Sequence, residues 1–530
     1  MNKKSTKKVN HQERFEQLQR VAVALMEPGS PGQVLYRIVD NAVHLLRCDG
    51  GSIYLKKNDY ELEFEVAINQ TIDVAFEKRA IPIDGESVAA FCYRKKKALK
   101  IEDVYTADGP YKFDPTFDKA TGYRTRSVLV QPLISTKGHS LGVLQLVNRK
   151  NEVGESWPMG DLGAIAKMPL FSDEDQRLLR SMASLASAAI ENALLYSNIE
   201  KLFEGFVKAA VQVIEQRDIS TRGHSERVAV LTVDLAKAVD RGGDAEVRDI
   251  HFSTQQLDEL RYAALLHDFG KVTVREETLL KAEKLPVQDK FKIEKRIEGV
   301  LYRHEIEILN ALLQTLHQEK RAPTDMDLAR MQKAVEVYRA RMQYLLNAVV
   351  ELNRPTVLDE DKSKKIQELK EFRFVDETGA SKDLLEKHEL DFLSIPRGSL
   401  SKAERLEIEA HVTQTYKFLR AIPWGDKFSH MAEIAWAPRE KLDGSGYPRR
   451  LHAERIPLQS RIMTICDIYD ALVAADRPYK KAVPVEKALA IIESETKSGK
   501  LDPRFLRVFI EARVFESEAF LALNREKKAA

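Results

Sequence analysis

Hydrophobic and polar positions follow two different patterns along the 530 residues of this chain. Up to about residue 170 the pattern is mixed, and the stretch ELEFEVAIN alternates apolar and polar residues as a half-buried strand does. RSVLVQPLI and SLGVLQLVNRK flank the turn-like STKGH and predict a β-hairpin. With helical segments before and after these strands, residues 32–175 are expected to form an α+β domain.

A long helix is predicted after the mixed region, over residues 176–213. Its apolar positions keep alternating steps of four and three, the spacing of a coiled coil. They are Leu178, Met182, Leu185, Ala189, Asn192, Tyr196, Ile199, Phe203, Phe206, Ala210 and Val213. The polar Asn192 is suited to fixing the register of a parallel dimer, so we expect a homodimer. The alternative is a helix packed against its own domain.

Helical spacing continues over residues 207–515, which predict an all-α domain. Within it, residues 287–398 are expected to be an inserted helical hairpin with a turn at Pro323 and an end at Pro355. The first helix carries Ile293, Ile297, Val300, Ile308, Leu312 and Leu316, and the second carries Leu328, Met331, Val335, Tyr338, Met342, Leu345, Val349 and Leu352. His304 and Glu305 fall inside this pattern and are expected on a solvated face, not at a ligand site.

The two ends of the chain are predicted to lie outside these domains. Residues 1–31 predict a polar tail and a short amphipathic helix, over 11–26, that ends before the Pro28–Pro31 turn. Residues 516–530 are expected to form a C-terminal tail. The fold class is therefore multidomain.

Composition narrows the classes of function. The net charge is only +2, from 83 Lys and Arg against 81 Asp and Glu, so no overall field favours a nucleic acid. No apolar run approaches the ~18 residues of a membrane-spanning helix. Cys48, Cys92 and Cys466 are scattered, which argues against disulfides or a cysteine zinc site and suits a reducing compartment. We therefore expect a cytoplasmic protein that binds neither nucleic acid nor membrane.

The candidate chemistry lies in the C-terminal half, where His and Asp occur in an ordered series of fragments. These are RGHSERV with His224, LLHDFGK with His267 and Asp268, EAHV with His411, and ICDIYDAL with Asp467. An adjacent His and Asp can point an imidazole and a carboxylate at one ion. This ligand pair suits iron, manganese or zinc. Because a lone His is more often a core residue, the ordered set carries the prediction.

Residues 207–515 resemble HD-GYP domains, a branch of the HD phosphohydrolases that typically hydrolyses cyclic di-GMP. The matching motifs are GHSERV, LLHDFGKV, DGSGYPRRL, IPLQSRIMTICDIYDAL, DRPYKKA and LDPRFL. The resemblance implies a divalent metal centre, with iron or manganese as the expected ion. It also implies cyclic di-GMP or a related phosphodiester as the ligand.

The resemblance assigns roles to individual residues. The first metal would be held by His224, His267, Asp268 and Asp467, and the second by His411 with Asp268 bridging. Asp268 and Lys271 would be the catalytic residues. Tyr447, Arg477 and Lys480 would bind the substrate.

One part of the pattern is missing. Members of the family typically read HHE-(K/R)-x-DG-x-GYP, with both histidines on the second metal, but here Pro438 and Arg439 take those positions. Proline offers no ligand atom, and arginine has no lone pair to donate. We predict one well-formed metal site, a doubtful second one, weak catalysis, and a role for Arg439 in binding substrate. The alternative is a non-catalytic, nucleotide-responsive sensor or interaction module.

The N-terminal α+β region resembles a GAF domain, a small-molecule sensing module. TGYRTRSVLVQPL, LGVLQLVNRK and FSDEDQ are similar to the GAF domains of cyclic-nucleotide phosphodiesterases, whose Asn-Lys, Phe, Asp-Glu pattern becomes Asn148-Arg149, Phe171 and Asp175-Gln176 here. The resemblance implies a sensor for an unknown small molecule that regulates the C-terminal site. A GAF fold used only for dimerisation is the alternative. Residues 151–170 are expected to be a local insertion, and Cys92 a core residue.

Overall fold

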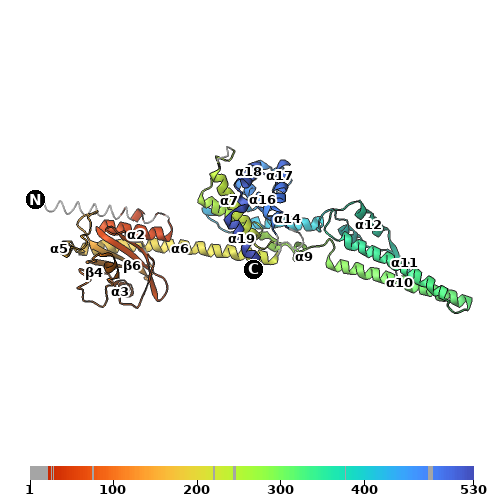
Figure 1. The fold of residues 1–530 in the computed structure, drawn as a ribbon, viewed down its shortest axis with the longest axis horizontal. Coiled ribbons are helices and arrows are strands. Elements are labelled where there is room, and N and C mark those ends of the chain that lie inside the picture. Colours follow the sequence, from red (N-terminus) through yellow and green to blue (C-terminus); the bar gives the residue numbers. More distant parts are fainter. Residues whose placement is uncertain are drawn as a thin grey trace. The chain divides into compact units, whose positions relative to one another are not determined.

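The computed structural model describes residues 29–73, 77–218, 221–242, 246–376, 378–474 and 482–529, with residues 19, 22–24 and 27. Most of the predicted helix over 11–26 lies outside the described residues. The chain divides into an N-terminal unit, Met1–Glu204, and a C-terminal unit, Gly205–Ala530. Figure 1 shows the sheet in the first unit and the mainly helical second unit. In the part of the chain that the structure describes, no helix has the length and apolarity needed to cross a membrane.

A six-stranded antiparallel sheet forms the centre of the N-terminal unit, in the order β3-β2-β1-β6-β5-β4. Its strands are β1 (Cys48–Lys56), β2 (Glu61–Asn69), β3 (Ala80–Pro82), β4 (Leu99–Ile101), β5 (Val128–Ile134) and β6 (Ser140–Arg149). The predicted strand is β2 and the predicted hairpin is β5–β6, so both are confirmed. The central strand β1 was not predicted. Its burial on nearly every residue removes the alternation that marks a half-buried strand.

Helices cover the sheet on both faces. α2 (Pro31–Leu46) and the start of α6 (Asp173–Arg217) pack on one side and α3 (Val88–Lys95) on the other, while α4 (Thr116–Thr121) and α5 (Leu162–Lys167) contribute Phe117 and Ile165 to a separate small cluster. One core cluster joins α2, β1, β5, β6 and the first turns of α6, and a second contains the buried Cys92, as predicted. Arg149 Nε lies 3.4 Å from Asp175 Oδ2, so two positions of the predicted motif meet where α6 begins.

The helix α6 is continuous over 45 residues, but the positions of its predicted heptad are buried in its first turns and exposed further along. Met182 is buried, and Leu185 packs against the sheet core, so the first turns belong to their own domain. Further along, the side chains of Tyr196 and Ile199 are 72% and 60% exposed. The apolar stripe that is open to a second chain therefore begins in the middle of the helix. The coiled-coil prediction for the earlier positions is therefore replaced by its alternative.

The C-terminal unit is built from short and medium helices. They are α7 (His224–Arg241), α8 (Thr254–Leu266), α9 (Glu276–Leu279), α14 (Lys402–Ala421), α15 (Met431–Ala435), α16 (Leu458–Val473), α17 (Val485–Lys497), α18 (Pro503–Glu511) and α19 (Glu518–Ala529), with the 3-10 turns η2 (Phe269–Thr273), η3 (Asp426–Phe428), η4 (Ala453–Arg455) and η5 (Val514–Glu516). The predicted tail over 516–530 contains α19. Its Phe520 is buried with its ring centroid 6.2 Å from that of Tyr469, so this segment joins the core.

The inserted segment contains the predicted hairpin, formed by α10 (Val287–Glu319) and α11 (Asp325–Leu352). Sequence reasoning missed its smaller elements, α12 (Glu360–Glu371), β7 (Arg373–Val375), β8 (Ser381–Asp383) and α13 (Lys387–Leu393). Apolar residues of α12 and α13 complete one core cluster with the two long helices. Leu328, at the far end of the predicted stripe, is 40% exposed because nothing in this cluster covers it.

Candidate metal centre

The centre begins where α8 ends. His267 follows the last residue of that helix, and its Nδ1 donates to the carbonyl of Ala264 at 2.6 Å. A carbonyl can only accept, so the lone pair of the ring is on Nε2. This atom lies 3.4 Å from Asp268 Oδ1 and 3.8 Å from Asp467 Oδ1. Burial lowers the pKa of His267, which favours the neutral ring that a metal requires.

His224 opens α7 and has a carboxylate on each ring nitrogen. Its Nε2 lies 3.2 Å from Asp467 Oδ1, and its Nδ1 lies 2.7 Å from Asp470 Oδ2. Asp470 is held in turn by Arg227, whose Nε donates to Oδ1 at 2.6 Å. Burial lowers the pKa of His224, but the contacts with Asp467 and Asp470 outweigh it and raise the pKa to about 9. A carboxylate behind a ligating imidazole is a common support in metal sites.

His411 enters from α14, which packs closely on η2. A Cβ at Gly270 would overlap the carbonyl oxygen of His411 and lie 2.7 Å from the Thr415 nitrogen, so this approach requires glycine. Thr415 Oγ1 accepts from the Gly270 nitrogen at 2.8 Å and donates to the His267 carbonyl at 3.0 Å. His411 Nδ1 donates to the carbonyl of Ile408, which leaves Nε2 facing Asp268 Oδ1 at 3.2 Å.

Lys271 lies beside these ligands on η2. Its Nζ is 2.8 Å from Asp268 Oδ2 and 2.9 Å from Asp218 Oδ2. Burial lowers the pKa of Lys271, but these two carboxylates outweigh it and raise the pKa. Asp218 directly follows the end of α6, whose last residue, Arg217, donates to the carbonyls of Val272 and Val274 on either side of η2's end. The long helix thus ends in direct contact with the lysine segment.

Arg439 contacts both carboxylates of the predicted first-metal set. Its Nη2 lies 3.3 Å from Asp268 Oδ1, and its Nη1 pairs with Asp467 Oδ2. Burial lowers the pKa of Arg439, but Asp467 and Asp268 outweigh it and keep the guanidinium charged. Burial raises the pKa of Asp467, and Arg439 then lowers it well below its usual range.

The loop after Arg439 is folded around a buried carboxylate. Glu440 accepts from the backbone nitrogens of Arg449 and Leu451 at 2.7 and 2.9 Å, which closes the loop. A Cβ at Gly446 would lie 2.6 Å from the carbonyl oxygen of Arg439, so the chain can cross itself only with glycine there. The Tyr447 nitrogen donates to that carbonyl at 3.1 Å. The DGSGYP loop therefore fixes the backbone of Arg439.

The donor set fits a divalent cation. Ligand atoms of His224, His267 and Asp268 all lie within 4.8 Å of one another. His267 Nε2 and His411 Nε2 are buried and have no hydrogen-bond partner among the described residues. Buried imidazole nitrogens that face carboxylates without a hydrogen bond are the ligand atoms a metal would satisfy. The structure thus brings the five residues predicted as metal ligands together.

Two predicted substrate-binding residues, Arg477 and Lys480, belong to the segment 475–481 and lie outside the described residues. Conversely, sequence reasoning missed Asp218, Arg227, Asp470 and Thr415. The sequence did contain a spacing signal for two of these four residues. Arg227 follows His224 by three residues, and Asp470 follows Asp467 by three, so each pair shares a helix face.

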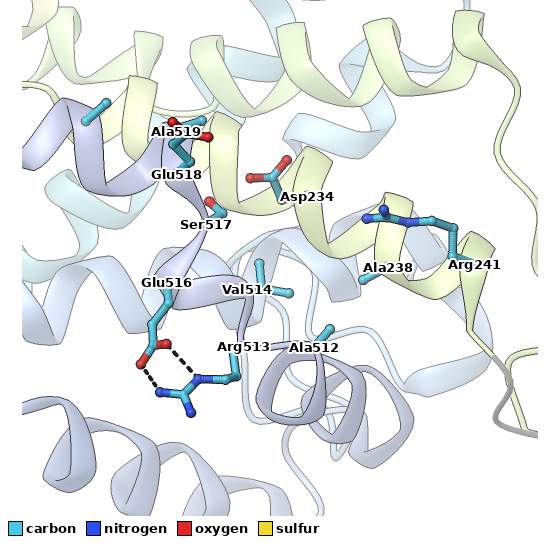
Figure 2. Close-up of a pocket in the computed structure, with 11 residues that line it drawn as sticks. Asp234, Ala238, Arg241, Ala512, Arg513, Val514, Glu516, Ser517, Glu518 and Ala519 are labelled. Carbon is cyan, nitrogen blue, oxygen red and sulfur yellow. Dashed lines mark hydrogen bonds and ion pairs between the residues drawn. The ribbon is translucent and has the colours of Figure 1, made fainter.

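A hollow of about 710 Å³ lies elsewhere in the C-terminal unit, between the C-terminal half of α7, η5 and α19. Figure 2 shows Asp234 and Arg241 on its α7 side and the paired Arg513 and Glu516 on the other. Its charges are of both signs, and it contains none of the predicted metal or substrate residues. We assign it no ligand.

Comparisons with known protein families match different domains in the N-terminal and C-terminal units. The profile of the GAF domain matches residues 30–190, and two profiles of the HD domain match residues 221–350 and 388–505. The segment between the two HD matches falls within the inserted region.

Individual relatives match only parts of the chain. The 3'3'-cGAMP-specific phosphodiesterase 3 of Vibrio cholerae serotype O1 is 42% identical over 106 residues, which cover 20% of this chain and 22% of that protein. The cyclic di-GMP phosphodiesterase response regulator RpfG of Xanthomonas campestris pv. campestris is 34% identical over 134 residues, 24% of this chain and 34% of that protein. The cyclic di-GMP phosphodiesterase of Thermotoga maritima is 42% identical over 97 residues, 18% of this chain and 25% of that protein. The chain thus covers between 22% and 34% of the length of these relatives.

Proposed function

We propose that the chain, which matches the GAF domain in its N-terminal part and the HD domain in its C-terminal part, is a signalling protein of GAF–HD-GYP architecture whose HD-GYP domain binds one divalent metal and hydrolyses a cyclic dinucleotide weakly. Cyclic di-GMP is the first candidate substrate, and 3'3'-cGAMP is the second because a relative acts on it. The observation that carries the proposal is the position of Arg439. Its guanidinium lies on Asp268 and Asp467, two of the four residues that would bind the first ion.

Each residue has a role in this proposal. His224, His267, Asp268 and Asp467 would hold the cation, which would supply an activated water and stabilise negative charge at phosphorus. Lys271 is fixed between Asp218 and Asp268 and would donate to a non-bridging phosphate oxygen. Iron or manganese suits this mixed nitrogen and oxygen ligand set.

Weak turnover follows from the loss of the second ion. His411 and Asp268 remain for it, but Pro438 and Arg439 provide no ligand atoms. Removing even an outer-shell partner lowers metal affinity about 10–100-fold, so the loss of two direct ligands should cost more. Arg439 keeps a positive charge near that position but offers no site for a metal-bound water.

The second candidate function is a non-catalytic, nucleotide-responsive module. It is favoured by the same contacts, because Arg439 neutralises carboxylates that the metal needs. Purified protein with Mn²⁺ or Fe²⁺ and either cyclic dinucleotide, assayed for linear product, separates the two functions. We expect turnover below about 0.1 per second, against roughly 1–1000 for typical enzymes. Saturable nucleotide binding without any product would establish the second function, and turnover above that limit would contradict weak catalysis.

We also propose that the GAF domain regulates this site through α6 in a homodimer of cytoplasmic chains. Two observations support the route. The end of α6 is joined to η2 by Arg217 and to Lys271 by Asp218. The middle of α6 carries the exposed Tyr196 and Ile199, at spacing suited to a parallel partner helix. A shift of α6 would therefore act directly on the lysine.

A further inference from the structure

The guanidinium of Arg439 and a bound metal require the same oxygen atom. Asp268 Oδ1 lies 3.3 Å from Arg439 Nη2, 3.2 Å from His411 Nε2 and 3.4 Å from His267 Nε2. It is therefore the oxygen that faces the imidazole lone pairs. On the other side, Arg439 Nη1 pairs with Asp467 Oδ2. A cation that binds between these carboxylates must compete with the arginine for their charge.

Arg439 also has donor capacity that the protein does not use. Its Nε is buried and has no hydrogen-bond partner among the described residues, while its side chain is still 22% exposed. Tyr447 lies close enough that Arg439 lowers its pKa, although burial raises that pKa more. An anion that reaches this loop would meet the partly exposed guanidinium, next to the phenol predicted to bind substrate.

We propose that Arg439 makes the binding of the metal and of an anionic ligand mutually dependent. A phosphodiester that pairs with the guanidinium withdraws its charge from Asp268 and Asp467 and so leaves these carboxylates free for the ion. By thermodynamic linkage, the ion must strengthen binding of the phosphodiester by the same factor. The proposal rests on the proposed function only in taking a cyclic dinucleotide as the anion.

This arrangement differs from two metals that share one site. Here an arginine satisfies the carboxylates until an anion arrives. The expected coupling is on the order of 5–150-fold, the usual range for linked sites. The centre would then hold its metal more tightly when the nucleotide is present, which suits a sensor better than a constitutive enzyme.

Titration of the full-length protein with Mn²⁺, followed through the electron paramagnetic resonance signal of the free ion, tests the proposal. Each titration is made without an anion, with saturating cyclic di-GMP and with sulfate. The test variant is Arg439→Gln, which keeps most of the side-chain volume and removes the charge. Arg439→Lys keeps a charge with fewer donors. The control is Arg449→Ala, because Arg449 lies in the same loop but stacks on Trp436, 3.8 Å from the ring centroid.

In the unaltered protein and in Arg449→Ala, we expect cyclic di-GMP to lower the Kd for Mn²⁺ at least fivefold. Arg439→Gln should bind Mn²⁺ at least fivefold more tightly without an anion and should lose most of the coupling, and Arg439→Lys should be intermediate. The proposal is overturned if Arg439→Gln binds Mn²⁺ no more tightly or keeps the full coupling. If Arg439→Gln does not fold, Arg439→Lys takes its place. The proposal is then overturned if Arg439→Lys has the same Kd for Mn²⁺ and the same coupling as the unaltered protein.

The sulfate titration separates this inference from the proposed function. Coupling by sulfate but not by cyclic di-GMP would retain the role of Arg439 and reject the cyclic dinucleotide as its ligand. Coupling by neither anion in the unaltered protein would reject the role of Arg439, whatever the enzyme hydrolyses. Binding of fluorescently labelled cyclic di-GMP, measured with and without Mn²⁺, must show the same factor as the metal titration.

Discussion

Asp218 Oδ2 lies 2.9 Å from Lys271 Nζ, so the residue that directly follows the long helix α6 holds the lysine of the candidate metal centre. The second carboxylate on Lys271 belongs to Asp268, which also faces two imidazoles and Arg439. The ammonium group is therefore positioned by one residue of the site and one residue of the segment that enters it.

We predict that Asp218→Asn lowers formation of linear dinucleotide by about tenfold to a hundredfold, because misplacement of a positioned group carries a cost of that size. The metal content should stay unchanged, since Asp218 faces the lysine and not the imidazoles. Product formation by chromatography and metal content by mass spectrometry provide the two readouts. The control is Asp234→Asn on α7, which lines the separate hollow in Figure 2. Equal activity in both variants would show that Asp218 positions nothing.

Restoring the missing ligands should restore the second ion. In the double variant Pro438→His with Arg439→His, His411 and Asp268 regain two imidazole partners, and the competing guanidinium is gone. We expect a second bound metal per chain and turnover raised at least tenfold. Arg439→His alone is the control, because it removes the cation but supplies only one ligand. If the double variant gains neither metal nor activity over the control, the diagnosis of a lost second site is wrong.

The carboxylate behind His224 should determine metal affinity. Asp470→Asn removes the charge that orients the ring and is expected to weaken Mn²⁺ binding about 10–100-fold. Asp240→Asn provides a matched control, because Asp240 pairs with the exposed ring of His251 at 3.0 Å, at the other end of α7. Isothermal titration with Mn²⁺ compares the two. Equal affinities would mean that the Asp470 contact is structural only.

The close approach of α14 to η2 depends on Gly270. The methyl group of Gly270→Ala would overlap the backbone of His411, and we expect a local cost of about 1–3 kcal/mol. Hydrogen exchange in peptides from α14 should then be about 5- to 150-fold faster. Gly299→Ala in α10 is the matched substitution, because no atom lies within 4 Å of its added Cβ. Unchanged exchange in Gly270→Ala would show that the helices can separate without cost.

The exposed stripe of α6 predicts a dimer in solution. Ile199→Glu places a charge on the stripe and should shift sedimentation toward the monomer. Asn198→Glu adds the same charge to the neighbouring exposed residue, off the stripe, and should leave the dimer intact. A monomeric unaltered protein at micromolar concentration would reject the dimer outright.

The sequence was most informative where spacing and chemistry coincided. His267 and Asp268 are adjacent, and the alternation of Leu62, Phe64 and Val66 predicted β2 directly. The hairpin of α10 and α11 followed from its stripes and from Pro323. By contrast, β1 is buried along both faces and has no period, and β7 and β8 are too short to show one.

The contacts made by Arg439 could not be derived from spacing alone. It is separated from Asp268 by the whole insertion, and the packing of α15 against α8, α14 and α16 brings it to that carboxylate. Sequence reasoning identified Arg439 as the wrong residue for a metal ligand and expected it to face the substrate. It did not predict that the guanidinium would lie on Asp268 and Asp467, two of the predicted metal ligands. The packing of the partly buried Leu185 against the core of the N-terminal unit was likewise a tertiary effect that a heptad cannot reveal.

The most direct measurement is the number of metal ions per chain, determined by mass spectrometry on protein purified without chelators and loaded with excess Mn²⁺. One tightly held ion per chain, increasing to two only in the Pro438→His, Arg439→His double variant, is the predicted result. Two tightly held ions in the unaltered protein would contradict the conclusion that Arg439 has replaced the second metal.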